Sequence, residues 1–103
     1  MVTTSLSFRV QPQSLGEALS AVTEIAERMR LSPGCRHSRL FSDVDDPNAF
    51  VLVSEWPDAR AAEAFLQSRE FQIFRGIRIL LRSEPLIVLD DVKARVTRLM
   101  ATH

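Results

Sequence analysis

Several residue types are scarce in this chain of 103 residues, and each scarcity excludes a class of structure. A single cysteine, Cys35, excludes an intrachain disulfide and a structural zinc site built from cysteine ligands. Basic and acidic residues number 13 each, so the chain lacks the net charge that favours binding to nucleic acid or to an anionic membrane. No apolar run approaches the roughly 18 residues needed to span a bilayer. We therefore expect no nucleic-acid partner and no membrane contact.

The N-terminus has neither a basic n-region nor an apolar h-region, so residues 1–5 do not predict a secretory signal. Together with the single cysteine, this indicates a reducing, cytoplasmic setting. Apolar residues make up 46% of the chain and charged residues 25%, a balance typical of a globular protein. The length suits one domain, which we expect to cover residues 1–103, with a core at about 5–90 and an extension at 91–103.

The first half of the chain predicts a strand, a helix and two further strands. Apolar and polar residues alternate over residues 5–10, the period of a half-buried strand. Ser14 and Glu17 have the S-x-x-E spacing of a capping box, and the helix that they open carries apolar residues at three- and four-residue spacing until a Pro-Gly pair. Two strand-like runs follow at residues 35–42 and 50–56.

The link between these two strands, residues 43–48, contains three aspartates, a proline and an asparagine. Clustered carboxylates are also found in calcium loops, but Pro47 and the missing glycine break the EF-hand pattern. Turn-forming residues in this density are typical of a hairpin. We therefore expect a plain turn and no metal site.

The second half predicts two helical stretches. Asp58 is placed to cap a helix at residues 59–66, and Ser68 to cap a second stretch that extends to about Leu81. Three arginines share one side of this second stretch and could hold an anionic group, although a solvated helix face is the commoner explanation: Arg75, Arg78 and Arg82.

An apolar run at residues 86–89 predicts the last strand. Apolar residues beyond it have helical spacing and predict a short C-terminal helix: Val92, Val96, Leu99 and Met100. The order β-α-β-β-α-β is that of the split βαβ, or ferredoxin-like, arrangement. We therefore expect an α+β domain with an antiparallel four-stranded sheet and two helices on one face.

Both faces of this sheet carry apolar residues. In the third strand, Phe50, Leu52, Ser54 and Trp56 point one way, and Val51, Val53 and Glu55 point the other. A sheet with helices on one face and water on the other should instead alternate cleanly between apolar and polar residues. A second copy of the chain would cover the open face, so we expect a homodimer packed sheet to sheet. The alternative is that the C-terminal helix covers its own sheet.

Several stretches resemble the antibiotic biosynthesis monooxygenase family: Pro33-Gly34-Cys35, residues 40–47, residues 50–56, and residues 63–68 with Phe71. The resemblance spans roughly residues 5–90. It implies a dimeric α/β barrel made of two ferredoxin-like protomers. It also implies oxidation of polyketide anthrones or quinols without metal or flavin, so that no cofactor is expected. The substrate of such oxygenases lies between sheet and helices, near a strand tryptophan that Trp56 resembles.

The chain departs from the family at two polar positions of this pocket. Those oxygenases have asparagines where this sequence has Leu52, and Ser7 or Phe8. An asparagine donates a hydrogen bond to the anionic substrate, and Leu52 cannot. Haem-degrading relatives have a histidine ligand where this chain has Arg75, which stays protonated and cannot bind iron.

These patterns give a set of candidate site residues. Trp56 would form a pocket wall, although a tryptophan at this place also suits core packing. His37 would serve as a general base if its strand points it into the pocket, whereas a strand histidine is more often exposed or simply hydrogen-bonded. The residues expected to contact substrate, with Arg75 at its polar end, are Phe8, Leu52, Phe65, Phe74 and Arg75.

Three functions are compatible with these residues. The first is a cofactor-independent monooxygenase that acts on a quinol, a phenol or a polyketide-derived aromatic. The second is a non-catalytic dimer that binds a small aromatic or apolar ligand, which the substituted asparagines favour. The third is an isomerase or cyclase that uses His37 on the same barrel.

Overall fold

The computed structural model of the chain describes residues 1–91 and 96–100. Short 3-10 turns at Pro12–Ser14 and Arg78–Leu80 accompany the regular elements. In chain order these elements are β1 (Val2–Arg9), α1 (Leu15–Arg30), β2 (His37–Ser42), β3 (Ala49–Trp56), α2 (Ala59–Leu66), α3 (Arg69–Gly76), β4 (Leu86–Asp91) and β5 (Val96–Met100).

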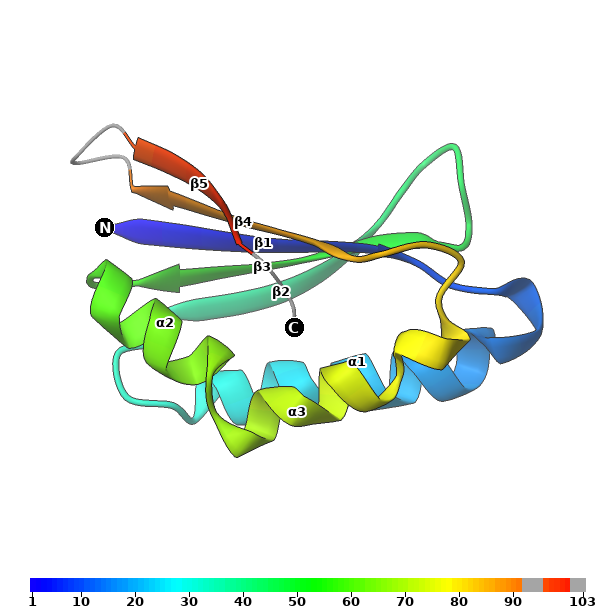
Figure 1. The fold of residues 1–103 in the computed structure, drawn as a ribbon, viewed down its shortest axis with the longest axis horizontal. Coiled ribbons are helices and arrows are strands. Elements are labelled where there is room, and N and C mark those ends of the chain that lie inside the picture. The colour runs from blue at the N-terminus through cyan, green and yellow to red at the C-terminus, as the bar shows by residue number, and fades with distance from the viewer. Residues whose placement is uncertain (92–95, 101–103) are drawn as a thin grey trace.

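The strands form one antiparallel sheet in the order β2-β3-β1-β4-β5. All three α-helices lie against one face of this sheet, as Figure 1 shows, and the loop between β2 and β3 rises on the other side. The expected α+β, ferredoxin-like order β-α-β-β-α-β is therefore confirmed, with one additional strand.

The additional strand corrects the expectation of a C-terminal helix. β5 pairs with β4, with Asp91 opposite Val96 and Ile87 opposite Met100. A short apolar run has no unambiguous period, so the helical spacing was weak evidence. Without β5 the edge of β4 would present unpaired backbone groups, and pairing satisfies them. The remaining extension residues, 92–95 and 101–103, lie outside the described part of the chain.

Two of the three predicted helix caps are confirmed. The Asp58 carboxylate accepts a hydrogen bond from the Ala61 N–H at 2.8 Å, and the Ser68 hydroxyl accepts one from Phe71 N–H at 3.4 Å. The Ser14 capping box is wrong, because the Ser14 side chain makes no capping bond. Ser14 ends a 3-10 turn with φ −109° and ψ 10° rather than the extended backbone that places a capping side chain.

The second helical stretch is also shorter than predicted. α3 ends at Gly76, and a 3-10 turn replaces its last part before the chain reaches β4. As a consequence, the three arginines of this stretch do not share a helix face. Arg78 pairs with Glu84, and the Arg82 guanidinium lies 3.8 Å from the Asp46 carboxylate.

Strand alternation divides the sheet into a buried and an open face, as predicted. The residues of β1 that face the helices are buried, and in β3 Leu52, Ser54 and Trp56 are buried on the same side. The open face carries half-buried Val51, Val53 and Val88. Two larger side chains there are nearly half exposed, Phe41 at 48% and Leu86 at 46%. The open face therefore carries a group of apolar side chains together with polar ones such as Ser5, Ser7 and Glu55.

Candidate functional site

A series of aromatic rings in contact runs through the layer between sheet and helices. Centroid separations along the series are 5.7, 5.8, 5.5, 6.1 and 5.8 Å. In spatial order the rings are Phe50, Phe8, Phe74, Phe71, Phe65 and Trp56. The sheet contributes both ends of the series and the helices contribute its middle, so aromatic packing joins the two layers.

Five of the candidate site residues lie together in this layer. They come from β1, β3, α2 and α3, and all are at most 4% exposed: Phe8, Leu52, Trp56, Phe65 and Phe74. Leu52 pairs with Leu6 on one side and Leu40 on the other. The position at which related oxygenases have an amide is therefore enclosed by apolar side chains. The layer is well packed around it.

Trp56 is the last residue of β3, and its indole has one hydrogen-bonding group. The Nε1–H donates to the Thr4 hydroxyl at 3.1 Å, and both residues are buried. The ring itself lies against Phe65 of α2 with an interplanar angle of 32°. The two sides of the indole thus have different partners: the N–H edge contacts the sheet, and the ring contacts a helix.

Sequence reasoning missed a row of buried hydroxyls next to this tryptophan. Thr4, Ser54 and Ser38 are register partners across β1, β3 and β2, and all three are buried. The hydroxyls of Ser54 and Ser38 both donate hydrogen bonds to the sulfur of Met29, a residue of α1 in the helix layer. In β1 the alternation of buried and exposed residues continues from the predicted strand back to Thr4 and Val2. A strand prediction that began at residue 2 would therefore have identified Thr4 as a buried hydroxyl.

Of Arg75, Arg78 and Arg82, Arg75 is the one that makes no ion pair among the described residues. Its Nε is buried and has no hydrogen-bond partner in the part of the chain that the structure describes. Arg75 lies four residues after Phe71 on α3, so the two side chains share a helix face. The guanidinium stays protonated, so this N–H remains able to donate to an anionic group.

His37 does not lie with the other candidates. It begins β2, opposite Glu55, on the sheet face away from the helices, and its side chain is 61% exposed. Because successive strand residues alternate between faces, Ser38 takes the inward position instead. Within one protomer His37 cannot reach a ligand held between sheet and helices.

Cys35 precedes β2 and is only partly exposed. Burial raises the pKa of its thiol, and this outweighs the lowering effects of the Arg30 charge and of a backbone hydrogen bond with His37. A thiol with a raised pKa is a poor nucleophile at neutral pH. This agrees with a packing role.

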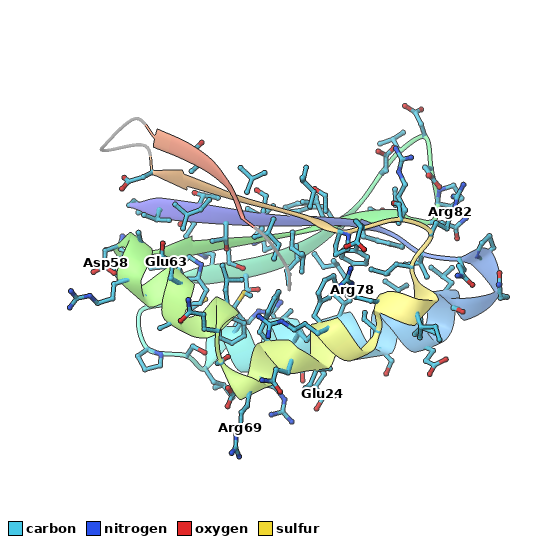
Figure 2. The ribbon with its side chains drawn as sticks, viewed as in Figure 1. Glu24, Asp58, Glu63, Arg69, Arg78 and Arg82 are labelled. Carbon is cyan, nitrogen blue, oxygen red and sulfur yellow. The ribbon has the colours of Figure 1, made fainter. Side chains whose placement is uncertain are left out.

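Described residues form two surface grooves near the sheet and helices. The first, the α1–α2 groove, has a volume of about 720 Å³ and lies between the end of α1 and α2. Its apolar lining includes Leu31, Pro33, Ala61, Ala64 and Phe65. Phe65, whose ring contacts Trp56, is a buried residue of this lining, and Figure 2 shows Asp58 just before α2 and Glu63 on α2.

The second, the hairpin groove, has a volume of about 740 Å³ on the open face of the sheet. It lies under the β2–β3 loop, where Val51 and Leu86 form part of its floor and Val44 part of its wall. Among the described residues, no group of three histidine, cysteine or acidic side chains is placed to hold a metal ion. No helix in the described part of the chain is long and apolar enough to cross a membrane.

Comparison with solved structures gives close structural matches. A crystal structure of an antibiotic biosynthesis monooxygenase is 28% identical, with a TM-score of 0.82 over 88% of this chain and 97% of that one. A protein of Mycobacterium tuberculosis is 18% identical, with a TM-score of 0.80 over 87% of this chain and 92% of that one. A conserved protein of Methanosarcina mazei is 19% identical, with a TM-score of 0.80 over 85% and 88%. The last two likenesses show the fold alone.

Sequence comparison identifies the family. No curated protein sequence matches the chain significantly. The sequence model of the antibiotic biosynthesis monooxygenase family matches residues 1–76, a range that includes β1, α1, β2, β3, α2 and α3. Since the match covers most of the chain and the fold agrees with it, this protein belongs to the antibiotic biosynthesis monooxygenase family.

Proposed function

We propose that this protein is a monooxygenase that oxidises a quinol, a phenol or a polyketide-derived aromatic. The observation that carries the proposal is the position of Trp56 one aromatic ring behind the lining of the α1–α2 groove. An aromatic substrate in this groove contacts Phe65 first. Rotation of the Phe65 ring about its Cα–Cβ bond would bring the substrate against the indole. Phe8, Leu52 and Phe74 continue the apolar surroundings behind it.

The reaction uses the substrate itself as the source of electrons. A deprotonated, electron-rich aromatic reduces O₂: one oxygen atom bonds to a ring carbon, and the other leaves as water with two hydrogens from the substrate. The substrate is thereby oxidised to a quinone. Charge on the substrate oxygen has to be stabilised by a fixed donor in a water-poor site. Leu52 cannot provide that donor, and Arg75, with an unpartnered Nε, is the residue on this side of the sheet that we assign to it.

We further propose that the functional unit is a homodimer in which the open sheet faces pack together. The support is the apolar surface that this face presents: Phe41, Val51, Val53, Leu86 and Val88. Leaving such side chains against water is unfavourable, and burying them is worth about 25 cal/mol per Å². The same packing agrees with the dimeric barrel that the family resemblance implies.

The single unpaired Cys35 suits the reducing cytoplasm, where we place the protein.

Oxygen uptake tests the catalytic proposal. Purified protein is assayed in an oxygen electrode with dithranol, an anthrone, and with hydroquinone, each against the uncatalysed background. We expect the wild type to accelerate uptake and Trp56→Phe to lose most of the acceleration, because phenylalanine leaves a gap where the indole packs. Ile79→Ala, at an apolar side chain that is 81% exposed and lines neither groove, is the matched control. Uptake at the background rate with every substrate would contradict the monooxygenase.

The well-packed layer around Leu52 favours a second candidate function. An apolar enclosure without an amide donor suits ligand binding without oxygen chemistry. In that case the dimer would bind a small aromatic molecule and release it unchanged. Quenching of tryptophan fluorescence by such a ligand, with no oxygen uptake, would identify this function.

A further inference from the structure

Trp56 has one polar atom, and the sheet already occupies it. The indole Nε1–H donates to Thr4 Oγ1 at 3.1 Å. Thr4 is the register partner of Ser54, two residues before Trp56, so it is the diagonal neighbour of Trp56 on the helix-facing side of the sheet. The exposed fractions are 1% for Trp56 and 4% for Thr4, so water does not compete for this bond.

This bond determines which part of the indole faces the helices. With the N–H edge held against β1, the ring lies toward Phe65, whose centroid is 5.8 Å away. If the indole turned over, its buried N–H would lose the Thr4 acceptor and meet the aromatic ring of Phe65. An unsatisfied buried donor is unfavourable, which disfavours the turned orientation.

We propose that Thr4 is a positioning residue that commits the indole N–H of Trp56 to the sheet, so that Trp56 contacts an aromatic ligand through its ring alone. The inference rests on the proposed function for the identity of the ligand. It also specifies which part of the ligand Trp56 recognises. A substrate oxygen receives no hydrogen bond from Trp56, and the tryptophan selects for flat aromatic area rather than for a pattern of hydroxyl groups.

The composition of the chain makes this contact directly observable. Trp56 is the only tryptophan and there is no tyrosine, so intrinsic fluorescence reports this one side chain. For the same reason, an amide-correlation NMR spectrum holds a single indole N–H signal. Thr4→Val keeps the shape of the side chain and removes the acceptor, whereas Thr4→Ser keeps the acceptor. Thr3→Val, on the next residue and the opposite sheet face, is the matched control.

Two measurements are made on each variant: the indole N–H signal, and the Kd of 1,4-naphthoquinone from quenching of Trp56 fluorescence. We expect Thr4→Val to move the N–H signal upfield and to speed its hydrogen exchange. We also expect it to raise the Kd about tenfold, because the indole is no longer held in the orientation that presents its ring to the ligand. Thr4→Ser and Thr3→Val should remain close to the wild type in both measurements.

Other results would overturn the inference. The inference is contradicted if the N–H signal is unchanged in Thr4→Val, or if the signal moves and the Kd does not change. It is also contradicted if 1,4-naphthoquinone does not quench the fluorescence of the wild type. If Thr4→Val does not fold, hydrogen exchange of the indole proton in the wild type still tests the inference. Saturation with 1,4-naphthoquinone should leave the exchange of the indole proton slow, and faster exchange would show that the ligand breaks the Thr4 bond. If these results are as expected while oxygen uptake stays at background, the monooxygenase proposal fails and the positioning role of Thr4 stands.

Discussion

His37 and Glu55 face each other across the β2–β3 pair, with Nε2 of the histidine 3.7 Å from Oε2 of the carboxylate. Trp56 follows Glu55 directly and therefore points to the opposite face of the sheet. The two candidate catalytic residues, His37 and Trp56, are thus separated by the sheet itself. A base on one face cannot take a proton from a substrate on the other.

Replacing His37 tests this separation. We expect His37→Gln to leave the rate of anthrone-dependent oxygen uptake unchanged, because the side chain lies outside the layer that holds Trp56. Arg75→Gln, which keeps a donor and removes the charge, should lower the rate by about tenfold or more, as expected for a lost charge-stabilising contact. Both variants are compared at one pH by oxygen electrode. A large loss of oxygen uptake in His37→Gln would contradict this and show that the histidine takes part in the reaction.

Val53 lies in the middle of the open sheet face and tests the homodimer. Val53→Asp would bury an unpaired carboxylate in a sheet-to-sheet interface, which is strongly unfavourable. We expect the variant to sediment as a monomer or to unfold, and the wild type to sediment as a dimer at micromolar concentration. Leu31→Asp is the matched control, because Leu31 is 86% exposed at the end of α1, on the helix side of the sheet. A wild type that sediments as a single monomeric species would contradict the dimer.

Leu52 distinguishes a packed core from an open pocket. Because it is buried between Leu6 and Leu40, Leu52→Asn should lower the free energy of unfolding by about 3 kcal/mol, through lost packing and a buried amide. Leu52→Met, of similar volume, should cost less than about 1.5 kcal/mol. Urea unfolding followed by Trp56 fluorescence measures both. Faster anthrone oxidation by Leu52→Asn would instead indicate a pocket with room for the restored donor.

Cys35 gives a prediction about pH. Burial raises the pKa of its thiol above 9.0, the value for an unperturbed thiol, so the folded protein holds less thiolate at any given pH than the unfolded chain. Alkylation by iodoacetamide should therefore be slower in the folded protein, with a midpoint at higher pH than in urea. The stability contributed by the neutral thiol is present below pH 9.0 and decreases as the pH rises through the raised pKa. A folded-state midpoint at or below that of the unfolded chain would contradict this.

Local pattern was sufficient for most of the elements and for the direction of most side chains. Alternation in β3 placed Leu52 and Trp56 on the same face because successive residues of a strand point to opposite faces of the sheet. Asp58 and Ser68 were identified as caps because a cap is decided by a few neighbouring residues. Ser14 has the same signature and fails, since the preceding 3-10 turn gives it the wrong backbone.

The direction of His37 and the nature of the C-terminal segment depended on pairing between distant residues. β2 is a polar edge strand, so its own sequence does not distinguish one face from the other, and a shift of one residue would exchange them. Pairing with β3 fixes that register. Val96–Met100 is too short for its period to be decisive, and it becomes a strand because β4 offers an edge to pair with.

The sequence by itself determined the fold class, the family and the aromatic content of the layer between sheet and helices. Only the tertiary structure decided that the indole of Trp56 meets the hydroxyl of Thr4, a residue 52 positions away along the chain. The physical reason is that strand order brings β1 beside β3, and no local pattern in either strand specifies its neighbour. Which residues are buried follows from alternation and composition, whereas which buried residues touch follows from the order and register of the strands.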